Sequence, residues 1–87
     1  MVKVIKAFNP RIARAARAYT DLRHTDLGVK ANVASWTVHR LETTGKVTPE
    51  NLSKILKVLE EYGVVVVFDS LTGEPSGLTF TKAPQER

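Results

Sequence analysis

The residues most able to take part in chemistry in this 87-residue chain are two histidines, His24 and His39, and the neighbouring Arg40. The histidines stand fifteen positions apart and the chain has no cysteine, so this spacing predicts no zinc site. Ser35, His39 and Asp26 have the side-chain types of a hydrolytic triad, but no segment that could form an oxyanion hole accompanies them. We therefore expect no enzyme, no metal site and no bound cofactor.

These residues belong to a stretch, residues 24–43, whose apolar positions fit two short helices that meet at a steep angle. Those positions are Leu27, Ala31, Val33, Val38 and Leu41. The first two are one helical turn apart, as are the last two, and the third falls in the break between them. Gly28 lies on the inner side of the first helix, and Asn32 suits the left-handed conformation of a tight turn. The pattern predicts a helix-turn-helix, which makes double-stranded DNA the first partner to consider.

Charge is distributed unevenly along the chain. Residues 1–47 carry nine lysines and arginines and three acidic residues, a net +6, whereas residues 48–87 carry a net −2. The basic half contains the predicted helix pair, as a phosphate-binding surface requires. A solvated basic face is the alternative that charge alone leaves open.

Two further helices flank this pair. The first begins at Asn9 and Pro10 and is expected to run to about Tyr19, while the pair itself is expected over residues 24–31 and 35–43. The apolar face of the first helix is expected to comprise Ile12, Ala15, Ala16 and Tyr19. The last helix has Thr48 as N-cap, Pro49 as first residue and Gly63 as stop. Its expected core stripe is Leu52, Ile55, Leu56 and Leu59, with an apolar flank formed by Val58 and Tyr62.

A pair of strands follows the last helix. The β-branched run of residues 64–68 is typical of a strand covered on both faces, and residues 72–77 and 78–81 predict a turn and a return strand. Residues 2–7 predict a short N-terminal strand. We expect this hairpin to pack against a second copy of the chain; a hairpin enclosed within one chain is the alternative. The expected interface residues are Val58, Tyr62, Val64, Val66, Phe68 and Phe80.

With these elements in order, residues 11–64 resemble the Cro/phage-repressor-like (XRE-type) DNA-binding family. The resemblance rests on the spacing of the helix pair, on Leu41-Glu42 followed by Gly45, and on the Thr48-Pro49 helix start. It implies a mainly α fold, a four-helix λ-repressor-like helix-turn-helix domain with a C-terminal β-hairpin. The chain would be one domain with an arm (1–8), a helical core (9–62), the hairpin (63–82) and a tail (83–87). The resemblance also implies an ion pair between Arg17 and Glu42 that bridges the first and third helices.

In such a domain the start of the third helix enters the major groove, so contacts are expected from that helix and its surroundings. The expected DNA contacts are His24, Thr25, Ala34, Ser35, Trp36, Thr37, His39, Arg40, Thr43, Thr44, Lys46 and Asn51. Arg40 is the best candidate for reading guanine, because its guanidinium matches O6 and N7; a phosphate contact is the alternative. Trp36 is expected to point outward, with burial against the second helix or the hairpin as the alternative.

These expectations describe a dimeric repressor that binds a palindromic operator in the cytoplasm. Nothing near the N-terminus has the pattern of a signal peptide, and the longest apolar run is too short to span a bilayer. No small-molecule ligand is expected. The alternative is an antitoxin that binds a toxin protein and autoregulates its operon; a non-specific architectural DNA binder is a third possibility.

Overall fold

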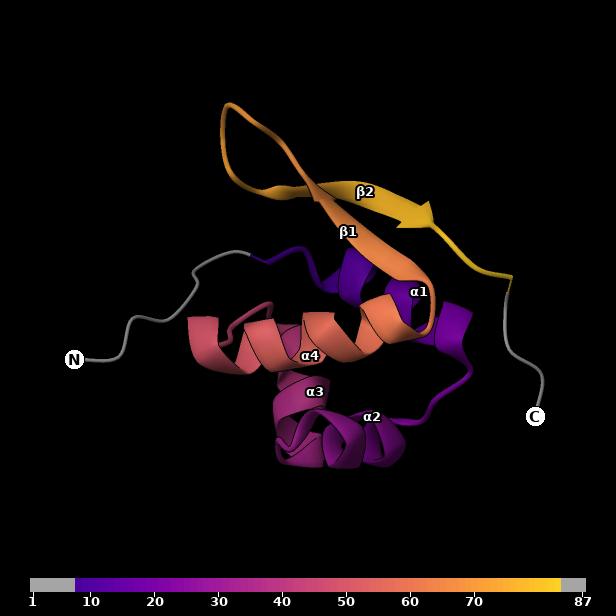
Figure 1. The fold of residues 1–87 in the computed structure, drawn as a ribbon. Helices are drawn as coiled ribbons and strands as arrows, with labels where there is room; N and C mark the ends of the chain where they lie inside the picture. Colours follow the sequence, from indigo (N-terminus) through magenta and orange to yellow (C-terminus); the bar gives the residue numbers. More distant parts are fainter. Residues whose placement is uncertain (1–7, 84–87) are drawn as a thin grey trace.

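Four helices followed by a two-stranded hairpin make up the computed structural model, which describes residues 8–83 (Figure 1). The helices are α1 (Pro10–Thr20), α2 (His24–Ala31), α3 (Ser35–Thr43) and α4 (Pro49–Glu61), and the strands are β1 (Val64–Phe68) and β2 (Pro75–Phe80). The predicted mainly helical fold with a C-terminal hairpin is therefore confirmed. The strand predicted over residues 2–7 lies outside the described residues.

The helices begin and end at the predicted residues because short-range capping dictates their ends. The Asn9 Oδ1 atom accepts a hydrogen bond from the Arg11 backbone N–H at 2.9 Å, and Thr48 Oγ1 accepts one from the Asn51 N–H at 3.2 Å. After α2, Asn32 adopts a left-handed conformation with φ of 59°. These caps satisfy backbone groups that a helix end otherwise leaves without a partner.

One core gathers apolar side chains from every helix and from β1. Its buried members are Phe8, Ala13, Ala16, Leu27, Ala31, Val38, Leu41, Val47, Leu52, Ile55, Val58, Leu59 and Val64. Two predicted faces need correction. In α1 the side chain of Ala13 is buried and that of Ala15 is exposed, the reverse of the prediction. In α4 it is Val58 that is buried, while Leu56 is only partly so. Both β1 and β2 pack against α1, and β1 packs against α4, so the strands contribute to which helix side is covered.

The hairpin is antiparallel and begins its return earlier than predicted. Val64 pairs with Phe80 and Val66 with Leu78, so these four side chains share the face that packs on the helices. Residues 75–77, predicted as turn, are the first residues of β2, and the loop is instead Asp69–Glu74. Proline is tolerated at the first position of an edge strand, and a register irregularity at Phe68 accommodates it there.

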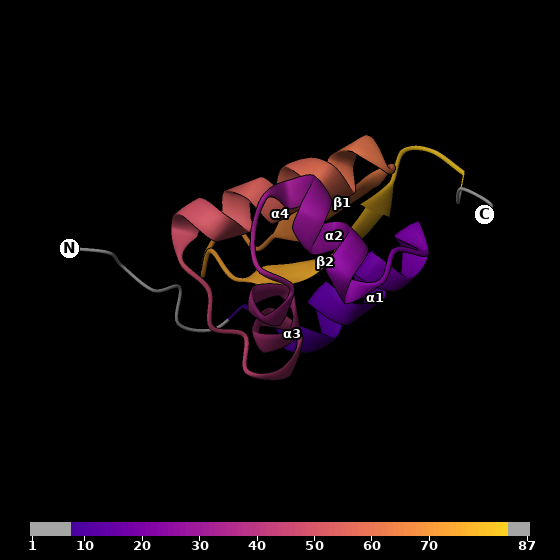
Figure 2. The same cartoon turned by 90° about the horizontal axis from the view of Figure 1, so that it is seen from below.

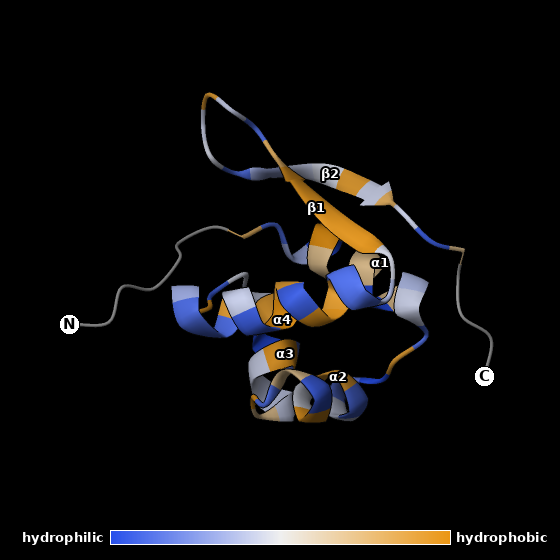
Figure 3. Ribbon diagram, in the orientation of Figure 1, coloured by the Kyte–Doolittle hydropathy of each residue, from blue (hydrophilic) through white to orange (hydrophobic). Residues whose placement is uncertain are grey.

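The cover of β1 decreases along the strand. Its burial falls steadily from Val64, which is fully buried, to Val67 and Phe68, which are 41% and 43% exposed. Figure 3 shows β1 as a strongly hydrophobic ribbon that extends away from the helices. Within one chain the helices therefore pack on one face of β1, and cover of its other face by a second copy stays a prediction.

The helices α1 and α4 separate the hairpin from the pair α2 and α3. Figure 1 shows the hairpin above and the helix pair below, and Figure 2, viewed from below, has α2 and α3 in front. The molecule thus presents two opposite ends, here called the α2–α3 end and the hairpin end. No helix within residues 8–83 is both long and apolar enough to cross a membrane.

Candidate nucleic-acid interface

The angle between α2 and α3 depends on one close backbone approach at Gly28. The Val33 N–H donates to the Gly28 carbonyl oxygen at 2.9 Å, which closes the turn after α2. A Cβ atom on Gly28 would lie 2.9 Å from the Val33 oxygen and 3.2 Å from the Ser35 nitrogen, both backbone atoms. A larger residue would therefore push α3 away from α2, which agrees with the expected position of Gly28 on the inner side of that helix.

A buried carboxylate ties α3 to α1. Glu42 is only 3% exposed, and its Oε2 accepts a hydrogen bond from Arg17 Nε at 2.6 Å while Oε1 accepts one from Arg17 Nη2 at 3.0 Å. This two-point geometry is the strong form of an arginine–carboxylate contact. The remaining Arg17 Nη1 donates to the Leu22 carbonyl at 2.9 Å, which fixes the segment leading into α2. The ion pair implied by the resemblance is therefore present.

Two further side chains contact Glu42, and the sequence did not reveal either contact. His24 Nε2 lies 3.1 Å from Glu42 Oε1, and Arg14 Nη1 donates to the Glu42 backbone oxygen at 2.6 Å. The sequence predicted His24 as a DNA contact and gave no partner for Arg14. No local spacing signals either contact, because both join residues 18 or more positions apart.

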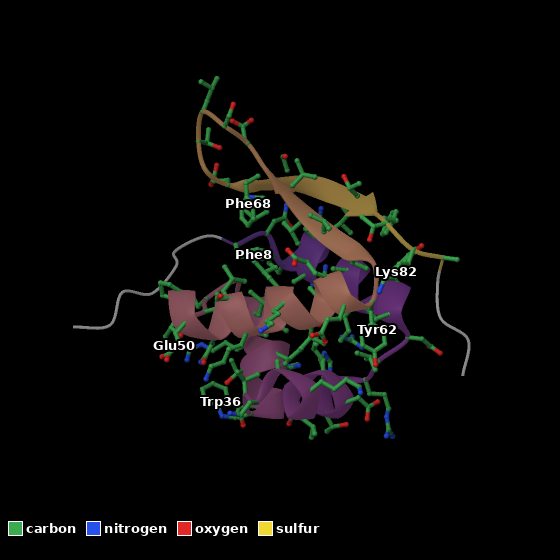
Figure 4. The ribbon with its side chains drawn as sticks, in the orientation of Figure 1. Phe8, Trp36, Glu50, Tyr62, Phe68 and Lys82 are labelled. Carbon is green, nitrogen blue, oxygen red and sulfur yellow. The ribbon has the colours of Figure 1, made fainter. Side chains whose placement is uncertain are left out.

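The outward side of α3 carries the exposed side chains at the α2–α3 end. Trp36 is 61% exposed, and Figure 4 shows it at the opposite end from Phe68. The alternative of a buried tryptophan is therefore wrong. One turn later the Arg40 guanidinium carbon lies 5.7 Å from the centre of the Trp36 ring. Between them in sequence, His39 is exposed and its ring meets that of His24 edge to face at 5.6 Å.

The end of α3 and the loop after it have their hydroxyl groups bonded to the helix itself. Thr43 Oγ1 donates to the His39 carbonyl at 3.0 Å, and Thr44 Oγ1 donates to the Arg40 carbonyl at 2.9 Å. The Lys46 N–H donates to Thr44 Oγ1 at 3.1 Å, and the residue is exposed. Lys46 is thereby held beside the end of α3.

The start of α2 is formed by Arg23 and Asp26. Arg23 occupies the N-cap position, and its N–H donates to Asp26 Oδ2 at 3.1 Å. The hydrogen bond and charge of Asp26 raise the pKa of the exposed Arg23 guanidinium above its usual value. Thr25 lies inside the helix with an exposed side chain, so it is not the cap. In α3, Ala34 is the N-cap and supplies no side-chain hydrogen bond.

The predicted contacts are thus mostly accessible. Those that are exposed are Thr25, Ala34, Ser35, Trp36, His39, Arg40, Thr43, Thr44 and Lys46, and those that are partly buried are His24, Thr37 and Asn51. All but Asn51 belong to α2, to α3 or to the residues directly bordering α3; Asn51 lies in the first turn of α4. The fold therefore gathers the predicted set around α2, α3 and the beginning of α4.

The predicted dimer interface is only partly available. Val58 and Val64 are buried in the core of their own chain, 5% and 0% exposed, so they cannot contact a second copy. Tyr62 and Val66 are partly buried against that core. Phe80, half exposed, stacks on the Tyr19 ring at 4.0 Å. Within the predicted set, Phe68 and Phe80 retain the largest free surface.

Within residues 8–83 no group of three histidine, cysteine or acidic side chains is placed to hold a metal ion. A scan against protein-family models and a search of curated proteins each give no match. The site is therefore argued from its own geometry and charge.

Proposed function

We propose that this protein is a sequence-specific DNA-binding regulator that inserts α3 into the major groove. The observation that carries the proposal is the two-sidedness of α3, which buries Val38 and Leu41 while Trp36 and Arg40 face outward. The major groove admits an α-helix whose exposed side chains reach the base edges. The buried ion pair between Arg17 and Glu42 fixes α3 to α1. A helix fixed in this way can hold its exposed side chains at constant positions relative to the bases.

The charge at this end supports the same proposal. Arg40 and Lys46 take part in no ion pair within residues 8–83, so their charges remain available to an anionic partner. Arg40 lies on the outward side of α3, and Lys46 follows the C-terminal end of that helix. Arg40 is proposed to contact base edges and Lys46 a phosphate, because a guanidinium matches guanine and an ammonium acts as a point charge.

A second copy completes the proposed regulator. One helix of this length reads few base pairs, and proteins of this kind use two half-sites related by two-fold symmetry. At the hairpin end Val67, Phe68 and Phe80 stay 41–50% exposed, although Phe68 contacts Phe8 and Phe80 stacks on Tyr19. We place the dimer contact there, and the family proposed is the Cro/phage-repressor-like (XRE-type) family with its helix-turn-helix formed by α2 and α3. The proposed compartment is the cytoplasm, where such operators lie.

The test is a footprint on the DNA upstream of the protein's own gene. The proposal predicts a protected palindrome whose half-site centres are about 34 Å apart, one turn of the duplex. Random duplex DNA of the same length should compete poorly. Equal competition by random DNA would instead identify a non-specific architectural binder, and no binding to either duplex would end the proposal.

An antitoxin is the second candidate, and the hairpin favours it. Leu71 in the loop is 94% exposed and follows the exposed Val67 and Phe68, so the hairpin offers several apolar side chains to a protein partner. In this reading the hairpin masks a toxin while α3 binds the operon's own promoter. The toxin would be encoded beside this gene. Leu71→Glu should then abolish toxin neutralisation and leave DNA binding intact, whereas unchanged neutralisation by this variant would remove the candidate.

A further inference from the structure

Trp36 and Arg40 form a contact pair on the free side of α3. They stand four residues apart, and the guanidinium carbon lies 5.7 Å from the centre of the indole ring. A cation over an indole face at this distance is attracted by the negative face of the ring. No other side-chain contact of Arg40 is recorded within residues 8–83, so the indole is what orients its guanidinium.

The two side chains have complementary capabilities. The guanidinium can donate two parallel hydrogen bonds to O6 and N7 of guanine, whereas the exposed indole offers a flat apolar surface. The only apolar group that a base presents in the major groove is the C5 methyl of thymine. Successive bases on a strand are 3.4 Å apart, so two groups in mutual contact reach neighbouring base pairs.

We propose that Trp36 and Arg40 act together to read a two-base-pair step, in which Arg40 binds guanine and Trp36 covers the methyl group of a thymine on the adjacent pair. This inference rests on the proposed function and adds to it the identity of the bases and the residue that reads the methyl group. The indole has a second role, because it holds the guanidinium before DNA arrives. Ordering of the arginine on binding then costs less.

Selection from a random duplex library tests whether the preference of Arg40 for guanine and that of Trp36 for thymine fall on adjacent base pairs. The wild-type protein should enrich a motif with guanine next to thymine in each half-site. Arg40→Ala should lose the guanine preference, and Trp36→Ala should lose the thymine preference while keeping a weakened guanine preference. Leu71→Ala is the matched control, since it truncates a more exposed apolar side chain at the opposite end, and its motif should equal that of the wild type.

Replacing that thymine by deoxyuridine removes only the methyl group. Burial of one such group corresponds to about a fourfold change in affinity. The wild-type protein should therefore bind the deoxyuridine duplex about fourfold more weakly, and Trp36→Ala should bind both duplexes equally. If the selected motif lacks the step, or if deoxyuridine leaves wild-type affinity unchanged, the inference is wrong although the proposed function stands. If no motif is enriched at all, the proposed function itself fails.

Discussion

The two ends of the molecule differ in how they are held and in what they expose. At the α2–α3 end, a buried carboxylate with arginine and histidine partners fixes the helices, and the outward side chains are mostly polar or charged, with Val29, Ala34 and Trp36 as the apolar exceptions. At the hairpin end, two aromatic contacts hold the strands, Tyr19 on Phe80 at 4.0 Å and Phe8 on Phe68 at 6.4 Å. Four of the six large hydrophobic side chains that are exposed within residues 8–83 lie there, namely Val67, Phe68, Leu71 and Phe80.

This difference separates two kinds of recognition. A polar and cationic surface on a braced helix suits a charged duplex, whose grooves demand a fixed register. An apolar hairpin that projects from the helices suits a protein surface, because burial of apolar area drives protein association. We therefore assign DNA to the first end and a protein, with a second copy preferred, to the other.

The largest expected effect breaks the bracing of the α2–α3 end. Arg17→Ala removes the guanidinium that pairs with the buried Glu42 carboxylate, and should lower the free energy of unfolding by about 3–5 kcal/mol. Thermal or urea denaturation followed by circular dichroism measures it. Arg11→Ala, an exposed position on the same helix, should change stability by less than about 0.5 kcal/mol. Equal effects of the two substitutions would show that the ion pair does not stabilise the fold.

A smaller effect is expected where α2 approaches α3. Gly28→Ala introduces a Cβ against two backbone atoms, and should cost about 1–3 kcal/mol by overpacking. Gly77→Ala is the control, since nothing lies within 4 Å of the added atom. Denaturation curves of both variants decide the point. A Gly28→Ala protein as stable as wild type would mean that the helices separate without cost.

The hairpin end is tested by placing a charge on it. Val67 is 41% exposed on β1, and a glutamate there should disfavour an apolar dimer contact by about 1–2 kcal/mol, roughly tenfold in the dissociation constant. Sedimentation or light scattering at several concentrations measures this constant. A wild-type protein that is monomeric at tens of micromolar would contradict the proposed dimer directly. Val29→Glu, at the other end of the molecule, is the matched control and should leave the dimer constant unchanged.

The salt dependence of DNA binding can be measured for two variants, each of which lacks one lysine charge, Lys46 near α3 or Lys82 after β2. Lys46→Ala should weaken binding to all sequences alike and reduce the slope of log affinity against log salt by about one unit. Lys82→Ala removes the same charge beside β2 and should leave the slope unchanged. Binding isotherms at four salt concentrations give both slopes. A reduced slope in the Lys82 variant would show that DNA contacts the hairpin end, contrary to the proposal.

The smallest effect concerns the hairpin loop at low pH. Backbone N–H groups of Leu71 and Thr72 donate to Asp69 Oδ1 at 2.8 and 3.1 Å, and they hold the pKa of that exposed carboxylate below its usual value. The loop is therefore stabilised above the unfolded pKa of about 3.9, and this contribution is lost as the pH falls through the lower folded pKa.

Nuclear magnetic resonance of the two amide protons can follow this titration. Their chemical shifts should move together below about pH 4, and Asp69→Asn should abolish the transition. Shifts that stay constant down to pH 2 would show that the hydrogen bonds do not depend on the charge.

Local sequence signals determined the helices and their ends. Asn9-Pro10, Asn32 and Thr48-Pro49 act over two or three residues, so they predicted the starts of α1 and α4 and the end of α2 without knowledge of the fold. The buried side of each helix was harder to predict. The exchange of Ala13 for Ala15 shows that a small rotation, set by the strands packed on α1, decides which alanine is covered.

In the candidate site, too, some features could be predicted from the local sequence and others depend on the tertiary arrangement. The exposure of Trp36 and Arg40 followed from the helical period, because Val38 and Leu41 had to face inward. The contacts of His24 and Arg14 with Glu42 could not be predicted, since they depend on how three helices are arranged in space. The DNA and dimer assignments remain predictions.

The central claim is that the outward side of α3 occupies a major groove, and guanine N7 reports on that groove directly. The decisive measurement is methylation interference on a bound duplex, with the wild-type protein and Arg40→Ala. The account predicts that N7 methylation of one guanine in each half-site prevents wild-type binding, and that the same modification has no further effect on the weaker binding of Arg40→Ala. Wild-type binding that tolerates N7 methylation at every guanine would contradict it.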